Sequence, residues 1–230
     1  MIRVPRWPKS PGGPTQCSVS FVAAGAVSDT TSGTSLSPAL PSGLRVNDIC
    51  LCINYNGSSK AVSISSGWSQ VFQTGEFTVW WRRMQSGDTA PTISGITAGN
   101  GDGAVIIAYR GCAISGSPIG ATSGSFTQNS SSGHVVTCNG ITTQNAYSKV
   151  LLLALAHYIN VSSTTWSSLS VGTNTPVQKA WPYGAGAPFV AVLVADYAQA
   201  TAGATGNASA TSSNIPYSYL DAALIELITT

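Results

Sequence analysis

Short apolar runs separated by turn-forming residues recur along the whole chain, and they limit what this sequence can fold into. The runs are rich in β-branched and aromatic residues and are bounded by Gly, Ser, Asn or Pro, which is the pattern of β-strands. They lie at 48–55, 68–72, 76–84, 103–110, 134–138, 148–159, 177–183, 189–197 and 219–228. No helical pattern lies between them, and a parallel sheet would need crossover helices, so we expect antiparallel pairing.

Two of these runs contain good helix formers, VLLLALA at 150–156 and DAALIEL at 221–227. Each is only seven residues long between turn signals, which is shorter than a typical helix and fits a strand that is buried on both faces. The sequence therefore predicts an all-β protein. We expect residues 17–230 to form one antiparallel, jelly-roll-like β-sandwich that follows an extended N-terminal arm at 1–16.

The order of motifs in the first half of the chain returns in the second half. DICLCINY, Trp68, TVWW and AVIIAYRG are followed in the same order by VLLLALAHY, Trp166, FVAVLVADY and AALIELIT. This echo suggests an internal duplication over 48–111 and 149–229, whose two uncovered apolar faces would close on each other in a two-sheet sandwich. Chance similarity is the alternative, because strand-rich segments resemble each other generically.

Charged residues make up only 8% of the chain, against about 25% in an average protein. The formal net charge of +2 gives no broad basic field, so we expect no nucleic-acid partner. The arm MIRVPRWPKSPGGPTQ carries prolines that forbid a helix and lacks the apolar core of a signal peptide. The longest apolar run, 150–156, is too short to cross a bilayer, so we expect neither export nor a membrane partner.

The chain has five cysteines, at positions 17, 50, 52, 112 and 138. An odd number without paired spacing favours free buried thiols over a disulfide framework. A metal site would need further ligands, and neither His134 nor His157 lies at the spacing of a zinc finger. We therefore expect no metal and no cofactor.

The usual catalytic motifs are absent from the sequence. It contains no G-x-S-x-G, no H-E-x-x-H and no P-loop. Several of its eight carboxylates, including Asp48, Asp88 and Asp102, stand in turns, where aspartate has an ordinary structural role. A glycosidase pair brought together by the fold stays open. The sequence gives no positive sign of one, and we expect a protein without catalytic residues.

The stretch EFTVWWRRM at 76–84 sets two tryptophans beside two arginines. Strand residues alternate between faces, so one face should carry Phe77, Val79, Trp81 and Arg83, and the other Thr78, Trp80, Arg82 and Met84. The first face is typical of a core, and the second of a partly exposed surface. Trp80 and Arg82 are therefore candidate partner-interface residues, because Trp and Arg are enriched at binding hot spots. The alternative is a cation–π pair on a free surface.

Several short motifs follow one another along the chain. SPALPSGLRVND precedes an apolar strand and is followed by SSGW, WWRRMQSGDTAP, VIIAYRG, SPIG and a closing AALIEL. This order resembles a family of tailed-bacteriophage and prophage proteins, which carry a P-x-G…GD segment, a GW turn, a W-x-R strand, a GD-x-x-P turn and an AYRG strand in that order. This chain departs from the pattern at Asn47, where the family favours glycine. The resemblance covers nearly all of the chain after residue 16.

The resemblance implies a structural protein of the virion, either a capsid decoration protein or a tail-associated protein. Its expected partners are the major capsid protein or other virion subunits, and it is expected to form a homo-oligomer within the particle. Arg3, Arg6 and Trp7 would anchor the arm to a neighbour by charge and buried aromatic area, unless the arm is a disordered terminus. The alternative function is a carbohydrate-binding module or adhesin, with Trp80, Trp166 or Trp181 stacked on sugar rings.

Overall fold

The computed structural model describes residues 17–57, 61–98, 101–129, 134–157, 165–180, 190–213 and 218–229. These residues form strands and connecting loops without a helix, and every pair of neighbouring strands is antiparallel. The predicted all-β class is therefore confirmed, including the two strands at 150–156 and 221–227 that contain helix formers. The jelly-roll description stays a prediction.

The first half of the chain forms one main sheet. Its strands, in spatial order, are β1 (Ser20–Ala24), β9 (Asp102–Arg110), β4 (Ile49–Asn56), β7 (Phe77–Arg83) and β6 (Ser69–Thr74), and β2 (Ser28–Thr30) also pairs with β9. The second half forms another main sheet. Its order is β10 (Ile119–Asn129), β19 (Ser218–Leu227), β13 (Ser148–His157), β16 (Val190–Gln199) and β15 (Val177–Ala180).

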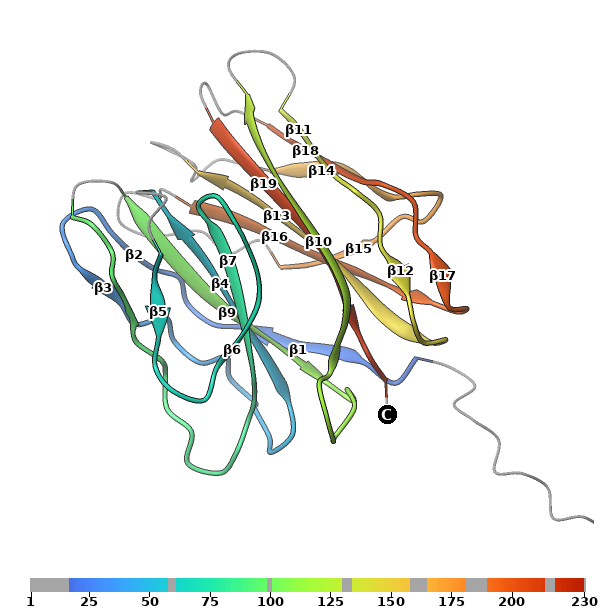
Figure 1. Ribbon diagram of the computed structural model, residues 1–230, viewed down its shortest axis with the longest axis horizontal. Helices are drawn as coiled ribbons and strands as arrows, with labels where there is room; N and C mark the ends of the chain where they lie inside the picture. The colour runs from blue at the N-terminus through green and yellow to red at the C-terminus, as the bar shows by residue number, and fades with distance from the viewer. Residues whose placement is uncertain are drawn as a thin grey trace, which may run out of the picture.

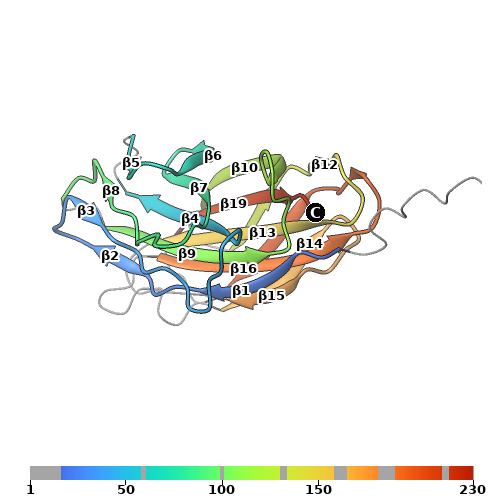
Figure 2. The ribbon, with the colours of Figure 1, turned by 90° about the horizontal axis from the view of Figure 1, so that it is seen from below.

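Smaller sheets accompany each main sheet. The first half adds β3 (Ser35–Leu36), β8 (Ile93–Ser94) and β5 (Ser63–Ile64). The second half adds β11 (Val135–Cys138), β18 (Ala208–Ser212) and β14 (Trp166–Val171), and the pair β12 (Thr142–Thr143) and β17 (Gly203–Ala204). Figure 1 shows the resulting layers from left to right, with the two main sheets in the middle, and Figure 2 shows β3 and β12 at opposite ends of the molecule.

Three apolar clusters hold these layers together. The central cluster takes side chains from both main sheets, among them Ile53 and Leu153. A second lies between the first main sheet and its small sheet, and a third between the second main sheet and β11, β18 and β14. Both main sheets are therefore buried on both faces. Two main sheets pack face to face, as expected for a β-sandwich, and the smaller sheets add a layer on the outer face of each, which explains why β4, β9 and β13 are almost continuously apolar.

The face of β7 that carries Trp80 and Met84 is expected from the sequence to be partly exposed, but the small sheet of the first half covers it. The alternation itself holds, since Phe77 and Val79 lie in the central cluster. Trp80 and Met84 point the other way, as predicted, yet they are only 4% and 3% exposed. The small sheet of β3, β8 and β5 covers them. Trp80 is thus a core residue, and its predicted place on a partly exposed face is wrong.

The two halves place their strands equivalently. The segments of the sequence echo become β4, β7 and β9 in one sheet and β13, β16 and β19 in the other, and both sheets have the same order. The registers also match: Ile49 lies opposite Arg83 and Tyr109, and Lys149 lies opposite Ala198 and Leu227. This agreement supports the duplication.

A residue with a left-handed backbone conformation lies two positions before Ile49 in β4 and two positions before Lys149 in β13. Asn47 has a φ of 71° and Tyr147 a φ of 60°. Such angles are strained for most residues with a Cβ and are tolerated best by Gly and Asn. The tight entry into the central strand is therefore a shared backbone feature of both halves.

We expect Asn47→Ala to lower the free energy of unfolding by about 1 kcal/mol, because alanine loses the left-handed preference that Asn has. Asn47→Gly is the matched control, and it should stay within about 0.5 kcal/mol of the wild type. Denaturant titration measures both variants. Equal stability of the Ala and Gly variants would contradict the role of the left-handed angle.

Candidate interaction surface

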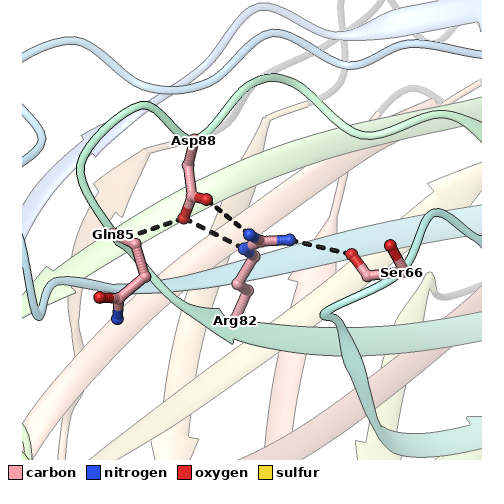
Figure 3. A network of polar contacts seen from close by, with 4 residues as sticks. All are labelled: Ser66, Arg82, Gln85 and Asp88. Atoms are coloured by element: carbon pink, nitrogen blue, oxygen red, sulfur yellow. Dashed lines mark hydrogen bonds and ion pairs between the residues drawn. The ribbon is translucent and has the colours of Figure 1, made fainter.

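Arg82 closes two turns at the end of β7. Its Nε and Nη2 donate to the two carboxylate oxygens of Asp88 at 3.1 and 2.5 Å, and its Nη1 donates to the carbonyl of Ser66 at 2.9 Å. Asp88 also accepts from the backbone N–H of Gln85 at 2.8 Å. Figure 3 shows that these four residues form one connected network. The fork of the guanidinium thus holds the 84–88 loop in place and ties it to the turn at Ser66.

The surroundings of Arg82 require glycine in the SSGW turn. Gly67 has a φ of +89°, and a Cβ built there would lie 2.4 Å from Nη1 of Arg82. Burial alone would raise the pKa of Asp88, but the hydrogen bonds from Gln85 and Arg82 outweigh it and lower the pKa below the ordinary value. Asp88 is therefore an ionised partner of Arg82 at neutral pH.

Arg110 holds a second loop at the end of β9. Its Nε and Nη2 donate to Asp48 at 2.8 and 2.6 Å, and Nη2 also donates to the carbonyl of Gly43 at 2.9 Å. The buried carboxylate of Asp48 accepts in addition from the backbone N–H of Arg45 at 2.8 Å. The segment from Gly43 to Asp48 is therefore tied down at three places.

Arg83 holds a third loop, which links the two halves of the chain. Its Nη1 and Nη2 donate to the carbonyls of Ala113 and Gly116 at 2.5 and 3.1 Å. The backbone N–H of Ala113 donates to the carbonyl of Ile228 at 2.8 Å. Three arginines thus fix three loops, 43–48, 84–88 and 111–116, along the lower side of the molecule in Figure 1. We call these loops the loop-end surface.

The loop-end surface is shallowly hollowed and carries exposed apolar side chains. An open hollow of about 470 Å³ lies between Leu44, Val46 and Met84, and a smaller one of about 150 Å³ lies between Val46, Arg110 and Ile114. Val46 is 54% exposed and Ile114 67%. Together with Val135 and Val177, they are the exposed large hydrophobic residues of the described part of the chain.

The candidate site residues of the sequence analysis fall in different places. Arg82 is a loop clamp, and its guanidinium is engaged by Asp88 and Ser66. Trp80 is buried beneath the small sheet. Arg3, Arg6 and Trp7 lie outside the described residues, so the proposed anchoring of the arm stays a prediction.

The tryptophans needed by the sugar-binding alternative are not available at the described surface. Trp80 and Trp166 are 4% and 7% exposed, and each is packed in an apolar cluster. Trp181 lies outside the described residues. Stacking on a sugar ring needs an exposed aromatic face, so the structure gives no support to Trp80 or Trp166 in this role.

Two polar groups that include residues of both main sheets lie near opposite ends of β9. At one end the hydroxyl of Tyr109 donates to Asp196 at 3.0 Å, and the Asp196 carboxylate lies 3.4 Å from Nζ of Lys149 and 3.7 Å from Nζ of Lys179. Burial and the Asp196 charge raise the pKa of Tyr109. This group joins β9 of the first sheet to β13, β15 and β16 of the second.

The other group consists of Tyr55, Glu76, Asp102 and Asp221, which influence one another electrostatically. Burial and the neighbouring Glu76 raise the pKa of Asp221 to about 8. Burial raises the pKa of Asp102 to about 6, against the effect of a hydrogen bond from the Gly57 N–H at 3.0 Å. These carboxyls take protons more readily than exposed ones do.

Glu226 is a further buried carboxylate with a structural role. It accepts from the backbone N–H groups of Ala121, Gln144 and Asn145 at 3.0 to 3.1 Å. It therefore ties the start of β10 to the turn before β13. The cysteines are all unpaired, and burial raises the pKa of Cys50 and Cys112 to about 12, so these thiols are unreactive at neutral pH.

Within the described ranges, no three His, Cys, Asp or Glu side chains are grouped so that they could hold a metal ion. The same residues contain no helix that is long and apolar enough to cross a membrane.

Comparisons of the chain with protein-family models, curated proteins and solved structures gave no match. The resemblance to phage proteins therefore stays a prediction that depends on the order of its motifs. Several residues of these motifs take part in the clamps: Asp88 pairs with Arg82, Asp48 pairs with Arg110, and Gly67 lies against the guanidinium of Arg82. The motifs describe how the loop end is built, and they do not by themselves identify a partner.

The sequence analysis did not single out Arg83, Arg110, Val46 or Ile114. The sequence signal for Arg83 and Arg110 is an arginine at the last position of a strand, directly before a turn. Such an arginine can reach the carbonyls of the adjoining loops, but which loops lie within reach depends on the pairing of distant strands.

We expect Arg82→Ala to lower the free energy of unfolding by about 1–2 kcal/mol, because one ion pair and a carbonyl hydrogen bond disappear. Arg82→Lys should restore less than half of the loss, since an ammonium cannot form the fork. Arg45→Ala is the control and should change stability by less than about 0.5 kcal/mol. Hydrogen exchange at Gln85 should become faster in both Arg82 variants, and an unchanged rate would contradict the clamp.

Proposed function

We propose that the chain is a non-enzymatic structural component of a phage virion, displayed as a capsid decoration protein or tail-associated protein. It binds the major capsid protein or other virion subunits through the loop-end surface. The observation that supports this best is the fixation of three loops by Arg82, Arg83 and Arg110 beneath exposed apolar residues. A surface that is already ordered loses little conformational entropy when a partner binds.

Composition and motif order support the same proposal. A chain with 8% charged residues suits a protein that is packed against others, because permanent interfaces are depleted in charge. The order of the motifs resembles that of phage and prophage proteins. A virion protein of this kind would be assembled into particles in the host cytoplasm.

The test is the composition of purified particles. Particles from a host that produces this chain are banded in a density gradient, and the chain is quantified against the major capsid protein by mass spectrometry. We expect a fixed copy number per particle across independent preparations. Recovery only as a free monomer would overturn the proposal, and tryptophan fluorescence changes with added glycans would then favour the carbohydrate-binding alternative.

A further inference from the structure

The loop-end surface carries one cation that the clamps do not use. The side chain of Arg45 is exposed and lines both hollows. Its backbone N–H donates to Asp48, but among the described residues no carboxylate pairs with its guanidinium. The guanidinium of Arg45 is therefore exposed to solvent, while its backbone is held by Asp48, and the exposed Val46 is its neighbour in the chain.

The charge of this surface is positive. Four guanidinium groups, those of Arg45, Arg82, Arg83 and Arg110, lie beside two carboxylates, which Arg82 and Arg110 engage in ion pairs. Arg83 donates to carbonyl oxygens, so its charge is not cancelled. A partner that brings carboxylates here would be attracted, and a basic partner would be repelled.

The apolar side chains define the second requirement for a partner. Val46 and Ile114 both line the smaller hollow, and Arg45 and Val46 also line the larger one. An extended segment could set an apolar side chain on Val46 and Ile114 and a neighbouring carboxylate on Arg45. Arginine is among the residues enriched at binding hot spots, where the surrounding contacts exclude water, and the apolar side chains beside it add buried area.

We propose that the loop-end surface binds an acidic, apolar segment of a partner protein, with a partner carboxylate on Arg45 and apolar side chains on Val46 and Ile114. This inference rests on the proposed function and names the chemistry of its partner. The N-terminal arm of a second copy is disfavoured as the occupant, because Arg3, Arg6 and Lys9 make it basic.

The test uses the full chain and three synthetic peptides. One alternates aspartate with leucine, the second has lysine in place of aspartate, and the third has serine in place of leucine. Binding is measured by fluorescence anisotropy at low salt and located by amide chemical shifts. We expect the aspartate–leucine peptide to shift the amides of Arg45, Val46 and Ile114 and to bind roughly tenfold more tightly than either other peptide.

Charge reversal gives the sharpest comparison. Arg45→Glu should weaken binding of the aspartate–leucine peptide by roughly tenfold or more and should improve binding of the lysine peptide. Val46→Ser should weaken it as well, whereas Val177→Ser, at an exposed valine outside the surface, should not. Thermal melts that match the wild type verify that each variant is folded.

Several results would overturn the inference. They are absence of binding by the aspartate–leucine peptide, equal binding of the lysine peptide, and unchanged affinity after Arg45→Glu. Concentration-dependent self-association that Arg45→Glu abolishes would name a second copy as the occupant instead. If Arg45→Glu still joins particles at the wild-type copy number, this inference fails while the proposed function stands. If the wild type is absent from particles, the proposed function itself fails.

Discussion

Asp196→Ala is expected to lower the free energy of unfolding by about 3 kcal/mol. Asp196 is 2% exposed and accepts from the fully buried hydroxyl of Tyr109. Its removal leaves that hydroxyl without this acceptor, and it leaves Lys149, whose side chain is 15% exposed, without this carboxylate. Unfolding in guanidinium chloride, followed by tryptophan fluorescence, measures the loss.

A double-mutant cycle separates the hydrogen bond from the ion pairs. Asp196→Asn keeps an acceptor for Tyr109 and should lose about half as much stability as Asp196→Ala. Tyr109→Phe should cost about 1–2 kcal/mol in the wild type and less in the Asp196→Ala background. Full additivity of the two substitutions, or an Asp196→Ala variant as stable as the wild type, would contradict this interaction between the sheets.

Acidification from pH 8 to pH 5 is expected to stabilise the fold, which is the second large effect. The pKa of Asp221 is about 8 and that of Asp102 about 6, both raised from 3.8. The folded state therefore binds protons more tightly than the unfolded chain does. This stability is fully present below about pH 4 and is lost as the pH rises through the folded pKa values.

The two groups contribute over overlapping pH ranges. Asp221 should give a slope of about 1 kcal/mol per pH unit over the whole range from about pH 4 to 8, and Asp102 should add a similar slope only between about pH 4 and 6. Asp221→Asn should therefore abolish the slope above pH 6.5 and reduce the slope below pH 6 by about half, whereas Asp102→Asn should reduce only the slope below pH 6. The measurement is the free energy of unfolding across this range. A wild-type stability that rises from pH 6.5 to 8 would contradict the burial of Asp221.

The strands could be predicted from the sequence because their apolar runs are short, β-branched and bounded by turn residues. Even 150–156 and 221–227, which contain helix formers, are strands, since buried pairing on both edges outweighs helix propensity. The covering sheets could not be predicted in this way. The strands of the sheet over Trp80 are two residues each, too short to give a periodic pattern.

The candidate site was predicted only in part. Alternation along the strand correctly placed Arg82 and Trp81 on opposite faces of β7. The partners of Arg82, Ser66 and Asp88, lie in turns, and which turns come within its reach depends on the register of β6 and β7. The charged residues inside apolar runs, Asp196 and Glu226, were visible in the sequence. Their roles were not, because each bonds to groups that only the packing of distant strands brings near.

Hydrogen exchange of the chain in free form and in purified particles is the most direct test of the claim that the loop-end surface is the assembly interface. We predict slower exchange in particles for the amides of Val46, Gln85 and Ile114, and an unchanged rate at Val177. Equal exchange of these three amides in both states, with protection confined to another surface, would contradict the claim.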